Sequence, residues 1–263
     1  MEITNKNIDN GKGFDWGRVS EDYAEFRDIY PEIFYRKILE MGLCVKGQRV
    51  LDIGTGTGVL PRNLYKYGAE FIGADISENQ IEQARRLSFE AGMDISYVVS
   101  PAETIVFPNK HFDTVTACQC YVYFNKKALF PKIHSILKDN GYFCILFMHW
   151  LSDKSEIAVN SEKMVLKYNP SWSDHSIKRF TYDFPDEATG LFEIKNSFTY
   201  DVSVNFTRDS WHGRIKACRG IGASSLSTEE IAKFEKEHIE YLKKVPETFV
   251  IPHFVTVFNL HKL

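Results

Sequence analysis

"VLDIGTGTGVL", from Val50 to Leu60, joins an apolar, strand-like segment to a loop in which Gly54, Gly56 and Gly58 stand two residues apart. Glycines at this spacing let a chain turn tightly against a bound ligand. In an open parallel sheet, ligands bind where such a loop follows the first strand and opens a helix. The stretch therefore predicts a ligand site at the end of a parallel strand.

Five short apolar runs alternate with segments of helical periodicity between residues 47 and 149. Runs that are apolar nearly throughout are typical of strands in a parallel sheet covered on both faces. The alternation predicts an α/β fold with a doubly wound sheet. The apolar runs are "QRVLDIG", "EFIGAD", "ISYVVS", "FDTVTACQC" and "YFCILFMHW", and the helical segments are "VLPRNLYKYG", "SENQIEQARRLSFEAG" and "NKKALFPKIHSILKDNG", the last ending at Gly141.

The flanking segments have other patterns. Before the alternating region, "SEDYAEFRDIYPEIFYRKILEMG" predicts two helices separated just before Pro31. After His149 the chain predicts a helix, a loop, an alternating strand, an amphipathic helix and a β-rich end. We expect lid helices in residues 1–45, a ligand-binding core in 46–150, a helical cap with a late strand in 151–245, and a strand in 246–263 that completes the sheet.

Composition limits the partners. The chain has 263 residues and a net charge of -3, with acidic and basic residues interspersed. There is no basic stripe for a nucleic-acid backbone, no signal-peptide pattern at the start, and no apolar run near the roughly 20 residues of a membrane span. We expect a cytoplasmic protein, monomeric or homodimeric, with no nucleic acid or membrane as partner, no metal, and reduced cysteines.

The residues around the glycine loop limit the kind of ligand that it can bind. A dinucleotide fingerprint spaces its last two glycines three apart, whereas these are two apart, and Asp52 puts a carboxylate where a pyrophosphate needs positive potential. Asp75 follows at the end of the next strand, roughly 20 residues on, where an acid can bind both hydroxyls of a ribose. No Gly-Lys-Ser/Thr follows the glycines. These features predict a cationic or zwitterionic ligand that contains a ribose and no phosphate.

Taken in order, the motifs resemble those of class I S-adenosylmethionine-dependent methyltransferases. "VLDIGTGTG" is similar to the first motif, "GADISENQIEQAR" to the second, "SPAETIVFPNKHFDTVTACQCYVYF" to the third and fourth, and "LKDNGYFCILF" to the fifth, over residues 20 to 150. The resemblance implies a Rossmann-like methyltransferase fold with a mostly parallel, seven-stranded sheet. It also implies S-adenosylmethionine as the co-substrate.

Carried over position by position, the resemblance implies a donor site. Gly54 and Gly56 pass beneath the methionine portion, Asp52 lies near its ammonium group, and Asp75 binds the ribose. Gln119 stands beside the donor methyl group. The other expected donor contacts are Thr55, Ile76 against the adenine, Gln80, Ala102 and Glu103 at the adenine edge, and Tyr23 and Arg27 from the lid.

The acceptor site is less defined by the sequence. His149 follows the fifth strand, where an imidazole can act as base or anchor. Arg214 and Arg219 can clamp an anion or form surface salt bridges. The front and tail are loosely similar to small-molecule methyltransferases of the type that includes trans-aconitate methyltransferase, which implies a small-molecule acceptor with a carboxylate or a hydroxyl. A non-catalytic S-adenosylmethionine-binding protein and a nicotinamide-dependent oxidoreductase are the other hypotheses.

Overall fold

The computed structural model describes residues 3–263 and divides into two compact units. The sheet unit comprises Pro31–Met148, Arg179–Tyr200 and Val255–Leu263. The helical unit comprises the described residues of Met1–Tyr30 together with His149–Lys178 and Asp201–Phe254. Met1 and Glu2, the first residues of the predicted lid, lie outside the described residues. No helix in residues 3–263 combines the length and apolar character needed to span a bilayer.

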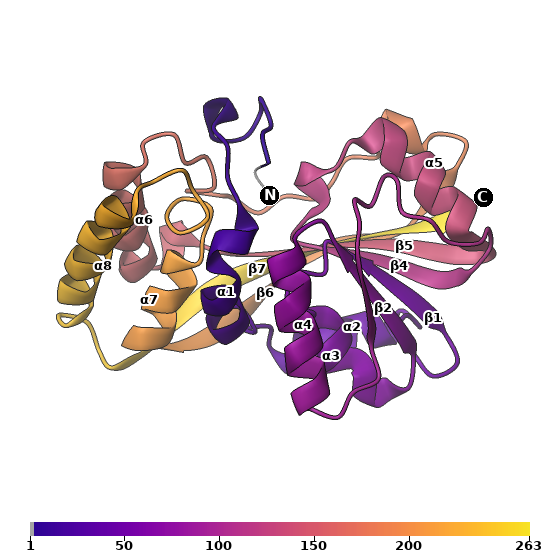
Figure 1. The fold of residues 1–263 in the computed structure, drawn as a ribbon, viewed down its shortest axis with the longest axis horizontal. Coiled ribbons are helices and arrows are strands. Elements are labelled where there is room, and N and C mark those ends of the chain that lie inside the picture. Colours follow the sequence, from indigo (N-terminus) through magenta and orange to yellow (C-terminus); the bar gives the residue numbers. More distant parts are fainter. Residues whose placement is uncertain (1–2) are drawn as a thin grey trace. The chain divides into compact units, whose positions relative to one another are not determined.

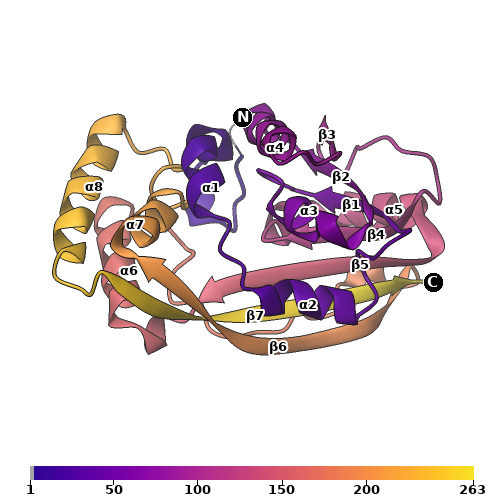
Figure 2. The ribbon, with the colours of Figure 1, turned by 90° about the horizontal axis from the view of Figure 1, so that it is seen from below.

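Seven strands form one sheet in the order β3-β2-β1-β4-β5-β7-β6. Parallel pairing joins β1 to β2 and β4, β2 to β3, and β4 to β5. Figure 2 shows β7 running opposite to β5 and β6. The predicted α/β fold with a mostly parallel, seven-stranded sheet is confirmed. The strands are β1 (Arg49–Ile53), β2 (Glu70–Asp75), β3 (Ser96–Val99), β4 (Phe112–Cys118), β5 (Leu137–Trp150), β6 (Phe192–Thr207) and β7 (Thr248–Lys262).

Three helices of the sheet unit follow the predicted alternation, namely α3 (Val59–Leu64), α4 (Glu78–Glu90) and α5 (Lys126–Ile136). A fourth helix, α2 (Glu32–Glu40), was predicted within the lid of residues 1–45 but belongs to the sheet unit. In Figure 1, α5 lies on one side of β4 and β5, and α2 and α3 lie on the other. A serine caps α4, because the Ser77 side chain accepts a hydrogen bond from the Gln80 backbone N–H.

Alternate side chains of β1 point to opposite faces of the sheet. Leu51 and Ile53 lie in the apolar cluster that also contains Phe130 and Ile133 of α5. Asp52 stands between the two apolar residues and therefore points to the other face. Its relative exposure is only 2%. The alternation places a buried carboxylate next to the end of a central strand, directly before the glycine loop.

The described residues of the helical unit form four α-helices, and three of them begin at a side-chain cap. The Ser155 side chain caps α6, and reciprocal capping boxes begin α7 and α8 at Thr207 and Ser227. These caps explain why the predicted periodic segments fold as separate helices. The helices are α1 (Ser20–Phe26), α6 (Glu156–Tyr168), α7 (Arg208–Lys216) and α8 (Thr228–Leu242).

A glycine lets α1 and α7 approach closely. A Cβ atom built on Gly213 of α7 comes within 2.3 Å of the Phe26 ring of α1. Any larger residue at this position requires the ring to move. The glycine in "SWHGRIKACRG" is thus explained by packing within the helical unit.

The helix predicted to end at Gly141 ends at Ile136 instead. Leu137 is extended (φ −73°, ψ 141°), fully buried and paired with Phe112. Lys138, the next residue, forms an ion pair of 2.8 Å with Asp113. The polar sequence "KDNG" resembles a turn after a helix, but the burial of Leu137 and pairing with β4 draw this stretch into β5.

The core beneath α5 offers a test of the fold. Phe130 is fully buried, whereas Phe89 on α4 is 86% exposed. We expect Phe130→Ala to lower the free energy of unfolding by about 3–5 kcal/mol, through lost burial and a residual cavity. Phe89→Ala, the control, should change it by less than about 0.5 kcal/mol. Chemical denaturation of both variants measures this, and equal losses would contradict the assigned core.

Candidate functional site

The carboxyl ends of the central parallel strands lie at one edge of the sheet unit. β1 pairs with both β2 and β4, but the chain runs from β1 to β2 and from β4 to β5. The connections leave the two central strands in opposite directions, which makes this edge the topological switch point of the sheet. The glycine loop, Asp75 and Gln119 all follow these strand ends.

The glycine loop depends on left-handed backbone. Gly54, Gly56 and Gly58 have φ angles of +61°, +55° and +75°, a region that other residues rarely adopt. A Cβ on Gly54 would lie 2.7 Å from both the Cβ and Sγ atoms of Cys120. The Thr55 N–H donates to the Ala74 carbonyl of β2 at 3.0 Å. The glycines lack a Cβ atom, so the loop backbone packs closely against its neighbours and a ligand can approach it closely.

Asp75 links the end of β2 to this loop. Its Oδ2 accepts a hydrogen bond from the Gly56 N–H, and its Oδ1 accepts one from the Ser77 N–H, both at 2.9 Å. Burial raises the pKa of the carboxyl, while these backbone donors oppose the rise. A carboxylate oxygen can accept more than one hydrogen bond. Asp75 therefore has a fixed orientation and acceptor capacity left for the two hydroxyls of a ribose.

Asp52 joins β1, β4 and the loop. Its Oδ1 accepts the Thr116 hydroxyl at 2.6 Å, and its Oδ2 accepts the Thr55 hydroxyl at 2.7 Å. Burial and, to a smaller extent, the Asp75 charge raise the pKa of Asp52 to about 7, against the effect of the two hydroxyls. At neutral pH the carboxyl is near its titration midpoint, so a cation beside it would favour the ionised form.

Other predicted donor contacts have definite places in the sheet unit. Ala102 is buried in the apolar cluster that contains α5 residues, and Gln80 is buried on α4. Ile76 is half-buried directly after Asp75. The Glu103 carboxylate accepts the N–H of Asn125, the residue before α5, at 2.8 Å. This bond gives Glu103 a structural role as well as the predicted one.

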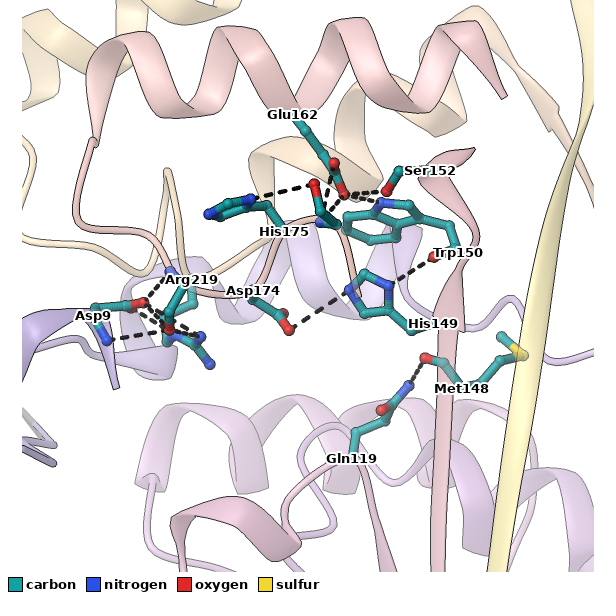
Figure 3. A network of polar contacts seen from close by, with 12 residues as sticks. Asp9, Gln119, Met148, His149, Trp150, Ser152, Glu162, Asp174, His175 and Arg219 are labelled. Atoms are coloured by element: carbon teal, nitrogen blue, oxygen red, sulfur yellow. Dashed lines mark hydrogen bonds and ion pairs between the residues drawn. The ribbon is translucent and has the colours of Figure 1, made fainter. Parts of the chain in front are cut away.

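Gln119 lies beyond the strand that was expected to contain it. β4 ends at Cys118, because Gln119 adopts a left-handed backbone with φ +68°. Its Nε2 donates to the Met148 carbonyl of β5 at 2.5 Å (Figure 3). The left-handed residue turns the chain at the carboxyl edge, and the amide is held against β5.

His149 belongs to the helical unit. It is 3% exposed, and its Nδ1 lies 2.9 Å from the Trp150 carbonyl oxygen (Figure 3). Because a carbonyl only accepts, Nδ1 carries the proton and Nε2 carries the lone pair of the neutral ring. Nε2 lies 3.6 Å from Asp174 Oδ1. Burial lowers the pKa of His149, with opposition from Asp174, so the imidazole is neutral at pH 7.

A buried carboxylate holds the segment that carries Asp174. Glu162 of α6 accepts hydrogen bonds from the Trp150 indole N–H at 2.7 Å and the Ser152 hydroxyl at 2.6 Å. The Ser176 N–H donates to it at 3.2 Å, as Figure 3 shows. Sequence reasoning missed Glu162 and Asp174, because neither stands in a motif and their partners are distant in sequence.

Arg214 and Arg219 are buried, with 4% and 5% exposure, so the surface interpretation of these residues is wrong. The Arg214 guanidinium carbon lies 4.8 Å from the centre of the Trp150 ring. Arg219 Nε lies 2.6 Å from Asp9 Oδ2. The pairing with Asp9 commits Arg219 to a structural ion pair, so only Arg214 retains the character of a predicted anion ligand.

The predicted lid contacts lie side by side in the helical unit. The Arg27 guanidinium carbon is 4.6 Å from the centre of the Tyr23 ring and 6.0 Å from that of Trp16. Burial, with a smaller contribution from the Arg27 charge, lowers the pKa of Arg214 to about 9. The positive charges of Arg27 and Arg214 therefore repel each other.

Within residues 3–263, no group of three or more His, Cys, Asp or Glu side chains is placed to hold a metal ion.

Comparison with known proteins agrees with this geometry. A family model described as a methyltransferase domain matches residues 50–141. A ubiquinone biosynthesis O-methyltransferase from Bradyrhizobium diazoefficiens is 30% identical over 189 residues, which cover 70% of this chain and 73% of the relative. A Dictyostelium discoideum protein named as a methyltransferase is 28% identical over 151 residues, 57% of this chain.

Some relatives are matched over only part of their length. The matched stretch spans 54% of the Dictyostelium protein and 59% of a second relative. A solved structure from Bacillus halodurans C-125, described as a methyltransferase, has a TM-score of 0.54 at 16% identity and covers 86% of this chain and 97% of its own. At this identity the structural likeness concerns the fold.

The glycine loop provides a test of the site. We expect Gly54→Ala to weaken binding of S-adenosylhomocysteine by at least about tenfold, because the new Cβ strains the left-handed backbone and meets Cys120. Gly92→Ala is the matched control, since Gly92 also has a positive φ (+66°) but open space around it. Calorimetric titration compares the two variants. Equal affinities would show that the tight loop is not part of the site.

Proposed function

Because the chain belongs to the class I S-adenosylmethionine-dependent methyltransferases, we propose that it is an enzyme that transfers a methyl group from S-adenosylmethionine to a small-molecule acceptor. One observation carries the proposal beyond family membership. The Asp75 carboxylate, the predicted ribose ligand, is hydrogen-bonded to Gly56 of the glycine loop. The glycine loop and Asp75, which together favour a ligand with a ribose and no phosphate, are thus joined in one structure before the ligand binds.

The residues of the sheet unit fit the donor. Gly54 leaves room for close approach, and Asp75 offers fixed acceptor oxygens to a ribose. Asp52 supplies negative charge for an ammonium group. We assign donor binding to Asp52, Gly54, Thr55, Gly56, Asp75, Ile76, Gln80, Ala102, Glu103 and Gln119, with Tyr23 and Arg27 as lid contacts.

Methyl transfer from S-adenosylmethionine requires mainly that the protein align the donor with the acceptor. The acceptor's lone pair forms a bond to the methyl carbon, and the sulfur–methyl bond breaks with its electrons returning to sulfur. The leaving group is a neutral thioether, so it needs neither an acid nor a metal. Positioning the two reactants and excluding water supply most of the catalysis.

His149 is the proposed base when the acceptor is a hydroxyl. Its neutral ring has the lone pair on Nε2, and Asp174 at 3.6 Å stabilises the imidazolium that forms when Nε2 takes a proton. An O-methyltransferase among the relatives supports an oxygen nucleophile. A carboxylate acceptor needs no base. Donor binding by residues 46–150 and acceptor binding by residues 151–245 are part of the same proposal.

Donor binding provides the first test of this function. Calorimetry should show binding of S-adenosylmethionine and S-adenosylhomocysteine, and none of NAD. Asp75→Ala should lose about 1–3 kcal/mol of that binding, as expected for a buried, charged hydrogen-bond acceptor. Asp139→Ala, at an exposed ion pair with Lys110, should bind normally. Binding of NAD in place of S-adenosylmethionine would support an oxidoreductase and overturn the proposal.

Proton linkage at Asp52 provides a second test. Since its pKa is about 7, a cationic donor should lower that pKa and release a proton on binding. Affinity for S-adenosylmethionine should therefore rise from about pH 6 to about pH 8 in the wild type, and Asp52→Asn should remove this dependence. Calorimetry in buffers of different ionisation enthalpy measures the released proton.

The same shift affects stability in the absence of the donor. A carboxyl whose pKa is raised by folding contributes stability at low pH, which is lost as the pH rises through the folded-state pKa. The wild type should therefore lose stability relative to Asp52→Asn between about pH 4 and about pH 7. A constant difference between the two proteins, together with pH-independent donor binding, would remove Asp52 from the proposed role.

A further inference from the structure

Arg214 is an unusual buried cation. Its side chain is 4% exposed, yet within residues 3–263 its Nε and Nη1 atoms have no hydrogen-bond partner. An ionised group in such surroundings is costly unless it is paired. The Trp150 ring, 4.8 Å from the guanidinium carbon, provides a cation–π contact, which offsets only part of that cost.

Arg219 shows how the same unit treats an arginine that has a structural role. It is equally buried, and it is paired with Asp9 through Nε at 2.6 Å and Nη2 at 3.4 Å. The Asp9 carboxylate also accepts from the Ser173 N–H and hydroxyl. The structural arginine of this unit is thus paired with a buried carboxylate, whereas Nε and Nη1 of Arg214 have no hydrogen-bond partner among the described residues.

The buried carboxylates near Arg214 are bonded to other groups. Asp9 is paired with Arg219, and Glu162 accepts from the Trp150 indole N–H and the Ser152 hydroxyl. Burial raises the pKa of the Asp174 carboxyl, but the cations around it lower that pKa below its ordinary value. None of these carboxylates is hydrogen-bonded to Nε or Nη1 of Arg214. The guanidinium therefore keeps donors for one more anion, and its planar fork matches the geometry of a carboxylate.

We propose that Arg214, lying over Trp150, binds the carboxylate of the methyl acceptor, and that the acceptor is therefore a small organic carboxylate. The inference rests on the proposed function and specifies its second substrate. The guanidinium donates its unmade hydrogen bonds to the carboxylate, and a charge-assisted bond of this kind is strong in a buried setting. Arg214 is then a specificity-determining residue, kept at a cost in stability for the free protein.

Stability provides a test that needs no knowledge of the acceptor. Arg214→Met replaces the buried cation by an apolar chain of similar length, and it should raise the melting temperature of the unliganded protein. Arg219→Met, the matched control, should lower it, because Asp9 is left buried and unpaired. A fall in melting temperature for Arg214→Met comparable to that of Arg219→Met would show that Arg214 is a structural residue and overturn the proposal.

Recognition is tested with named probes on the full chain saturated with S-adenosylhomocysteine. Acetate, pyruvate and benzoate are compared with the neutral amides acetamide, pyruvamide and benzamide by thermal shift and calorimetry. At least one acid should bind at least tenfold more tightly than its amide. Arg214→Met should abolish this preference, and Arg214→Lys, which keeps the charge, should retain part of it. No preference for any acid over its amide in the wild type would overturn the proposal.

The carboxylate of the donor's own methionine is the other source of the same chemistry. If Arg214 binds that group, Arg214→Met should weaken S-adenosylhomocysteine binding tenfold or more, and the acceptor assignment falls. If donor affinity is unchanged while the acid preference disappears, the acceptor assignment stands. Failure of the wild type to bind S-adenosylhomocysteine at all would instead contradict the proposed function. The acid and amide titrations without donor would then still report on Arg214.

Discussion

The buried carboxyl of Asp52 holds the centre of the sheet unit together. It receives one hydroxyl from Thr116 on β4 and another from Thr55 in the glycine loop. The two central strands and the loop between β1 and α3 therefore share one acceptor. This arrangement fixes the loop at the switch point of the sheet, and it keeps an ionisable group where a cationic ligand is expected.

Much of this sheet unit could be predicted from the sequence. Apolar runs and glycines report on local structure, so the strands of the alternating region and the glycine turn were predicted correctly. The helix that ends at Ile136 was not, since pairing between Leu137 and Phe112 involves residues far apart in the chain. Local patterns carry no information on such partners.

The hydrogen-bond and ion-pair partners of individual side chains also could not be predicted from the sequence. The hydrogen bond that Thr116 donates to Asp52 depends on the register Asp52↔Thr116, and a threonine inside an apolar strand gives no separate signal. In the helical unit, Asp9 and Arg219 pair across most of the chain. Arg214 and His149 were selected by residue type and position, but whether each was buried, paired or exposed required coordinates.

The composition of the two units has a consequence for biosynthesis. Each unit is assembled from three separate stretches of chain. Three of the boundaries between them fall within β5, β6 and β7, and the other two lie at Tyr30/Pro31 and Lys178/Arg179. The N-terminal stretch of the helical unit must wait for residues beyond 200, and the sheet unit must wait for Val255–Leu263. Contacts of such long sequence separation form slowly. A nascent chain that has only emerged through β5 therefore has neither unit complete, and the edge of β5 stays unpaired and exposed to aggregation until β7 has been synthesised.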